Sequence, residues 1–191
     1  MNSILANGYF VLSVSPIIIK PNCFLCGKRQ DCLSCSMKCY SPRALCVKSY
    51  RGHKLGCPNY GLKPDCPPFA PMYDVVFDLN VENFALGVSV DIKEHIEILK
   101  GRHSSWSEYQ LRNPLYWQGS VRRLLKGHIN AFISEKPKYR ATLRPEAMGV
   151  DIIKTLKNAG KQIEWYPSTI VTKIAFLGIP TCSQYNDILI F

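Results

Sequence analysis

Eight cysteines lie close together near the start of this 191-residue chain, and their spacing suits metal binding. They are Cys23, Cys26, Cys32, Cys35, Cys39, Cys46, Cys57 and Cys66. Only Cys182 lies outside the group. Thiolates bind soft metals, and thiols stay reduced in a cytosolic compartment. The clustering therefore predicts metal ligation, with structural disulfides as the less favoured alternative.

The eight cysteines divide most simply into two sets of four. The first set holds two Cys-x2-Cys pairs: Cys23, Cys26, Cys32 and Cys35. The second set is Cys39, Cys46, Cys57 and Cys66. The two pairs are closer together than the roughly 12 to 20 residues that separate such pairs in most zinc modules, whereas a cage of four thiolates suits a [4Fe-4S] cluster. We expect one or two [4Fe-4S] clusters, with zinc as the alternative.

A histidine and two carboxylates extend the list of candidate site residues. His53 lies four residues before Cys57 and could replace one thiolate, or it could be an ordinary loop histidine. A cluster with such a corner could act as a redox centre or Lewis acid, with Asp65 or Glu146 as acid–base partners. A turn residue and a first-turn helix acid are their simpler roles. No phosphate-binding loop, dinucleotide motif or nucleophile–base set is present, so the reaction stays open.

The chain is basic, with a net charge of +10 and a pI near 9.2. Ten lysines and arginines face only two glutamates between Lys100 and Arg144. This asymmetry favours RNA or DNA as a partner, and a solvated basic face is the alternative. The candidate contacts are Arg112, Arg122, Arg123, Lys126, Arg140 and Arg144. Aromatic residues lie between them, where they could stack on bases or fill the core: Trp106, Tyr109, Tyr116, Trp117 and Tyr139.

Hydrophobic periodicity predicts the elements that must position these residues. Strands are expected at 8–19, 84–90, 162–166 and 170–177, and helices at 92–99, 105–113, 116–133 and 145–160. Asp91 and Glu94 have the spacing of a capping box, and so do Ser105 and Glu108. His128 falls within the apolar stripe of the 116–133 helix, which predicts a core position over a ligand role.

The order of these elements predicts an α/β or α+β fold, with a small sheet covered by helices. Residues 1–20 supply an N-terminal strand, 21–71 a cysteine-rich metal-binding region, and 72–191 the core, with its basic helical segment at 100–144. The region from 64 to 71 is rich in proline, which predicts an extended connector. No apolar run approaches the roughly 18 residues of a membrane span, and no leader pattern is seen. We expect a cytoplasmic protein without a membrane partner.

Two motifs resemble a known family. GCPNYG at 56–61 with CPPF at 66–69, and RPEAMGVD at 144–151, are similar to segments of a family of uncharacterised predicted metal-binding proteins thought to carry iron–sulfur clusters. This chain has His53 where the family pattern has a cysteine, and its additional cysteines lie at the N-terminal end. The resemblance implies iron–sulfur over zinc and implies no particular reaction.

Overall fold

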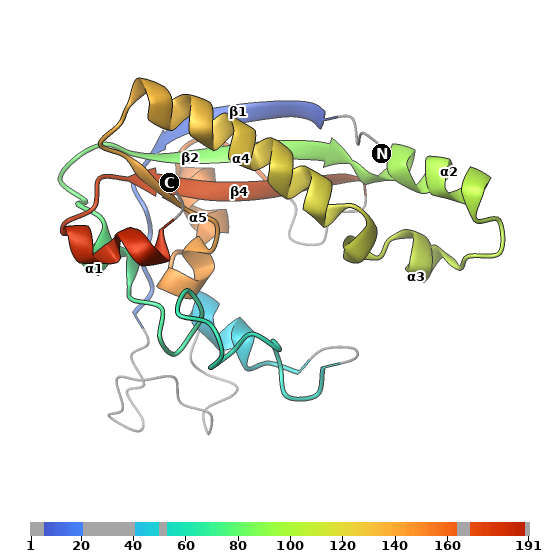
Figure 1. Ribbon diagram of the computed structural model, residues 1–191, viewed down its shortest axis with the longest axis horizontal. Coiled ribbons are helices and arrows are strands. Elements are labelled where there is room, and N and C mark those ends of the chain that lie inside the picture. Colours follow the sequence, from blue (N-terminus) through green and yellow to red (C-terminus); the bar gives the residue numbers. More distant parts are fainter. Residues whose placement is uncertain (1–5, 21–40, 50–52, 164–168, 190–191) are drawn as a thin grey trace.

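The computed structural model describes residues 6–20, 41–49, 53–163 and 169–189. Its centre is a four-stranded antiparallel sheet with the order β1-β2-β4-β3 (Figure 1). The strands are β1 (Ala6–Val14), β2 (Asn83–Asp91), β3 (Arg140–Thr142) and β4 (Ile170–Gly178). Helices cover the sheet, so the predicted α+β class is confirmed.

The two faces of the sheet carry separate hydrophobic clusters. Phe84, Leu86 and Val88 alternate along β2 and face α4 (Gln118–Glu135), which lies across one side of the sheet (Figure 1). The opposite face packs against α1 (Tyr73–Val76) and α5 (Ile152–Asn158). Since alternate residues of a strand point to opposite faces, the fully buried β2 needs apolar or small residues at nearly every position.

Helix α4 follows the predicted apolar stripe. Val121, Leu125 and Ile129 recur every four residues and are fully buried against the sheet. His128 is half-buried at the edge of this stripe, so its predicted core position is only partly right. Its ring stacks on Tyr9 of β1, with 4.2 Å between the ring centroids.

Helices α2 (Ile92–Arg102) and α3 (Glu108–Leu111) lie beyond the ends of β2 and β4 (Figure 1). Asp91 caps α2 as predicted, and its carboxylate accepts hydrogen bonds from the backbone N–H groups of Lys93 and Glu94. The predicted capping box at Ser105 is wrong by two residues. Ser107 and Gln110 form it instead, because the Ser107 hydroxyl accepts from the N–H of Gln110 and the Gln110 side chain bonds back.

Two predicted elements are shorter than expected for one shared reason. β1 ends at Val14, and the 145–160 helix is divided into a 3-10 helix, η3 (Pro145–Met148), and α5. Between these two helices, Gly149 has a φ of 85°, and its carbonyl accepts a hydrogen bond from the N–H of Ile19 at 2.8 Å. Residues 17–19 therefore hydrogen-bond to the backbone between η3 and α5, and they do not continue β1 in the sheet.

Other departures concern short elements. Neither α1 nor β3 was predicted, because four and three residues are too few to show a periodicity. The strand expected at 162–166 is not present at 162–163, and 164–168 lie outside the described residues. No helix in the described part of the chain is long and apolar enough to cross a membrane.

Candidate metal centre

Three of the eight clustered cysteines, Cys46, Cys57 and Cys66, lie in the described segments 41–49 and 53–163. Cys46 ends the short 3-10 helix η1 (Pro42–Cys46), whereas Cys57 and Cys66 lie in the turns that follow. The remaining predicted ligands lie outside the described residues: Cys23, Cys26, Cys32, Cys35 and Cys39. Cys57, Cys66 and Cys182 carry free thiols, and Cys182 is exposed beyond β4.

Cys46 and Cys57 are joined through their backbones. The N–H of Cys57 donates to the carbonyl of Cys46 at 2.7 Å. Gly56 makes this approach possible, since it has a φ of 87° and a Cβ there would lie 2.5 Å from the Cys46 carbonyl oxygen. Only glycine fits both the backbone conformation and the space.

Cys57 and Cys66 are joined through a second set of turns. Gly61, with a φ of 69°, donates its N–H to the carbonyl of Pro67 at 2.9 Å. The N–H of Ala70 donates to the carbonyl of Cys66 at 2.9 Å. The proline-rich segment from 64 to 71 therefore folds into turns, and the prediction of an extended connector is wrong. Cys66 is buried, with 6% of its surface exposed, and Cys57 is half-buried.

Arg144 contacts the buried thiol of Cys66. Its Nη1 donates to Cys66 Sγ at 3.2 Å and forms an ion pair with Asp65. Burial raises the pKa of the Cys66 thiol, the Arg144 guanidinium opposes this effect, and Asp65 and Cys57 add to it. An N–H donor on the sulfur stabilises negative charge there, so Arg144 favours the thiolate that a metal requires.

The cysteine segment is fixed to the core by a buried arginine. Arg43, 7% exposed, donates from Nη2 to the carbonyl of Pro68 at 3.0 Å and from Nη1 to the sulfur of Met72 at 3.2 Å. Met72 in turn immediately precedes α1. These contacts hold η1 against the turn that follows Cys66.

The donor set fits a thiolate-bound metal by its chemistry. Cys46, Cys57 and Cys66 come from three separate turns that are held together by the backbone, and one sulfur accepts an N–H donor. Within the described ranges, no three histidine, cysteine or acidic side chains are already grouped closely enough to hold an ion. His53 is exposed, and its carbonyl accepts from the N–H of Gly56 at 3.2 Å.

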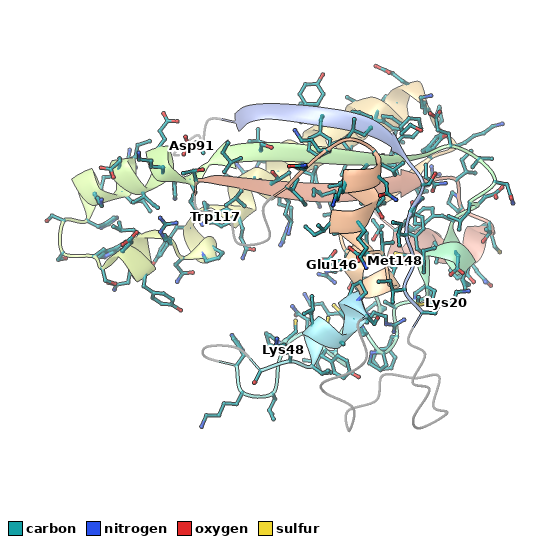
Figure 2. The ribbon with its side chains drawn as sticks, turned by 180° about the vertical axis from the view of Figure 1, so that it is seen from behind. Lys20, Lys48, Asp91, Trp117, Glu146 and Met148 are labelled. Atoms are coloured by element: carbon teal, nitrogen blue, oxygen red, sulfur yellow. The ribbon has the colours of Figure 1, made fainter. Side chains whose placement is uncertain are left out.

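The two candidate acid–base residues differ in their surroundings. Asp65 is engaged by Arg144 and is only half-exposed. Glu146 lies in η3 and remains exposed, yet desolvation by the surrounding protein raises the pKa of its carboxyl, and Lys173 and Arg144 partly offset this rise. Figure 2 shows Glu146 between the sheet and the segment that carries Cys46.

Two of the predicted nucleic-acid contacts, Arg112 and Arg140, make bonds within the protein. Arg112 forms an ion pair with Glu108 at 3.1 Å, and Arg140 donates to the carbonyls of Pro137 and Tyr139 at 2.9 Å and 2.8 Å. These two arginines lie after α3 and in β3 respectively.

The other basic candidates divide between α4 and the metal centre. Arg122 and Arg123 are exposed neighbours on α4, and Lys126 is half-buried one turn later. Arg144 belongs to the environment of Cys66. Arg144 and Cys66 are 78 residues apart, and no local sequence signal predicts a contact over this separation. The RPEAMGVD motif nevertheless contains this arginine.

The aromatic residues fall into two groups. Trp117 and Tyr139 are half-buried and pack against the core. Trp106 stacks on His103 with 4.0 Å between centroids and contacts Tyr116 at 4.8 Å, so three rings lie in series beside α3. Tyr116 and Tyr109 are 50% and 59% exposed at this end of the molecule.

Comparisons with known proteins give no relative for this chain. No family model matches the sequence, and neither the curated proteins nor the solved structures give a significant match.

Proposed function

We propose that the chain binds an iron–sulfur cluster through Cys46, Cys57 and Cys66, with Cys39 as the fourth thiolate. The observation that supports this most strongly is the set of backbone links between the segments of these cysteines: the 2.7 Å hydrogen bond from the Cys57 N–H to the Cys46 carbonyl, and the turns between Cys57 and Cys66. The similarity of the GCPNYG and CPPF motifs to a family thought to carry such clusters supports the same ligands. The remaining four cysteines form a second candidate set.

A bound cluster of this kind supplies one-electron redox chemistry. The residues of this chain would tune that chemistry through the charge near the sulfurs. Arg144 donates a hydrogen bond to Cys66 Sγ at 3.2 Å. Because a hydrogen bond and a positive charge stabilise the more negative, reduced form, Arg144 would raise the reduction potential.

Metal content and the visible spectrum of protein purified without oxygen test this proposal. We expect about four iron and four sulfide ions per chain, or about eight of each if both sets of cysteines are filled. Cys57→Ser and Cys66→Ser should lose the visible absorption that bleaches on reduction. Cys182→Ser is the matched control and should keep it, since this exposed thiol lies outside the cluster of cysteines. Colourless protein with one or two zinc ions would contradict the proposal.

A structural zinc site with RNA or DNA as the partner is the second candidate. The exposed pair Arg122 and Arg123 on α4 and the ring series ending in Tyr116 favour it. If five or six phosphates are contacted, the logarithm of the affinity should fall with the logarithm of the salt concentration at a slope of about −5. Arg122→Glu with Arg123→Glu should weaken this binding and leave the metal content unchanged. A flat salt response would exclude nucleic acid.

A further inference from the structure

Strand β1 forms one edge of the sheet, and in the described part of the chain it pairs only with β2. Figure 1 shows it as the outermost strand, at the margin of the face that α4 crosses. A register shift lies between Ala6 and Gly8, and from Gly8 to Val14 the pairing with β2 is regular. Half of the backbone N–H and C=O groups of such a strand point outward, where a further strand can pair with them.

This edge lacks the features that keep the edges of monomeric proteins from pairing, which are charged side chains, proline and very short strands. β1 has nine residues and contains neither a charged residue nor a proline. No charged side chain precedes Lys20, although 20% of the residues in the whole chain are charged. At the other edge, β3 has only three residues, and the part of β4 that extends beyond it carries Lys173. β1 is therefore the unprotected edge of the two.

The side chains of β1 leave an apolar strip beside this edge. Phe10, Leu12 and Val14 pack against the core on the face that carries α5. The alternate residues point to the face of α4, and there Tyr9 is 61% exposed and Val11 is 39% exposed. Helix α4 thus covers the middle of the sheet and leaves the outer strand open.

The side of α4 that faces β1 is uncharged around the point of contact. His128 identifies this side, because its ring stacks on Tyr9. The residues one helical turn before and after it are Leu124, Leu125, Ala131 and Phe132, all of them apolar. The three cations of α4, Arg122, Arg123 and Lys126, lie roughly 120° or more around the helix axis from His128.

One cation lies near β1 on the other face of the sheet. The Lys161 ammonium is 5.0 Å from the centre of the Phe10 ring. That ring covers Gly87 of β2, where it would contact an added Cβ. Since the Phe10 side chain leans inward over β2, the lysine above it lies over the sheet, away from the open side of β1.

We propose that two copies of this chain associate through β1. The two strands pair antiparallel about a two-fold axis near Val11, the middle of the regular part of β1, and join the two sheets into one of eight strands. Charge selects this partner: a chain with a net charge of +10 repels its own copies, so they can approach only through an uncharged surface. An acidic partner would find no cation in β1 to bind.

The symmetry of this contact limits the assembly to two chains. An antiparallel edge paired with itself presents the same surface from both copies, and each copy uses its β1 once. The exposed strip of Tyr9 and Val11 then continues from one copy into the other across the axis. The association is independent of the proposed metal centre, whose segment lies below the sheet in Figure 1 while β1 is at its upper margin.

Sedimentation equilibrium of the whole protein over a wide range of concentrations tests the proposal. We expect a species with twice the mass of the chain that dissociates on dilution. Val11→Lys should raise its dissociation constant at least about tenfold, because like charges opposite each other across an antiparallel pair repel. Ile98→Lys is the matched control and should leave the constant unchanged, since Ile98 is 41% exposed and lies on α2, beyond the end of the sheet.

Ser13→Lys is a second variant in case Val11→Lys does not fold. Ser13 is exposed on the same face of β1, so a lysine there replaces no packed side chain, and the same loss of association is expected. A wild type that stays monomeric at every concentration would overturn the proposal, as it would if another segment of the chain or a foreign peptide covered the edge. A dimer that Val11→Lys and Ser13→Lys leave intact would place the contact elsewhere. A mass that rises without limit would show open aggregation and contradict a closed dimer.

Discussion

Gly56→Ala is the most direct test of how the candidate metal centre is built. Gly56 has a φ of 87°, and a Cβ at this position would lie 2.5 Å from the carbonyl oxygen of Cys46 and 2.9 Å from the Cα and carbonyl carbon of Val47. Those atoms belong to the backbone of the neighbouring turn. They can relieve the clash only if the turns that carry Cys46 and Cys57 move apart.

Two separable effects contribute to the expected loss. A non-glycine residue in a left-handed conformation costs roughly 1–2 kcal/mol. Separation of the turns would additionally break the hydrogen bond from Cys57 to Cys46, which is worth about 0.5–1.5 kcal/mol, and would move one sulfur relative to the other. The second effect alone should weaken metal retention by a factor of about 2 to 13, since 1 kcal/mol corresponds to a factor of about 5.

Gly61→Ala is the matched control because it isolates the conformational effect. Gly61 has a φ of 69°, but no atom lies within 4 Å of the position that a Cβ would take. Both variants should be exposed to graded chelator, with the metal content and visible absorption followed to half-loss. We expect Gly56→Ala to lose metal at a clearly lower chelator concentration. Equal values for the two variants would refute the idea that the backbone approach of Cys46 and Cys57 preorganises the site.

Two further predictions concern the core. His95 is buried, its Nε2 has no hydrogen-bond partner among the described residues, and desolvation lowers its pKa. The unfolded chain therefore takes up a proton on this histidine more readily than the folded chain, so the free energy of unfolding should fall as the pH drops below about 6.5. His95→Leu should remove this pH dependence, which denaturant titrations at several pH values would measure. Tyr73→Phe should lower the free energy of unfolding by about 1–3 kcal/mol in urea, because the buried Tyr73 hydroxyl donates to Asn83 Oδ1 and its loss leaves that oxygen without a donor. A His95→Leu variant with the pH profile of the wild type would contradict the first prediction. A Tyr73→Phe variant with the urea midpoint of the wild type would contradict the second.

The elements that sequence analysis predicted well are those with strong local signals. Helix α2 combines an Asp91 cap with a regular apolar face, and α4 repeats buried residues every four positions. β2 and β4 carry enough apolar residues in succession to be recognised as buried strands. In each case the residues that determine the element lie within the element, so periodicity is sufficient.

The elements that were mispredicted depend on distant partners. The apolar residues 17–19 continue the pattern of β1, but their backbone pairs with Gly149 and Asp151, more than a hundred residues later. Glycine suits position 149 because its φ of 85° lies in the left-handed region that other residues rarely adopt. A glycine in a helical pattern indicates a possible break, but only the tertiary contact decides that a break occurs.

The candidate site shows the same division between local and long-range signals. Cysteine spacing predicts which residues could bind a metal, because thiolates are ligands for soft metals wherever they occur in the chain. One group that acts on Cys66 comes from a distant part of the chain, since Arg144, which donates to its sulfur, lies 78 positions away. Substitution of Arg144 should therefore change the properties of the centre without removing a ligand, whereas substitutions in the cysteine turns should change its occupancy. The two kinds of substitution differ in the quantity that reveals them: the reduction potential for Arg144, and the metal content for the cysteine turns.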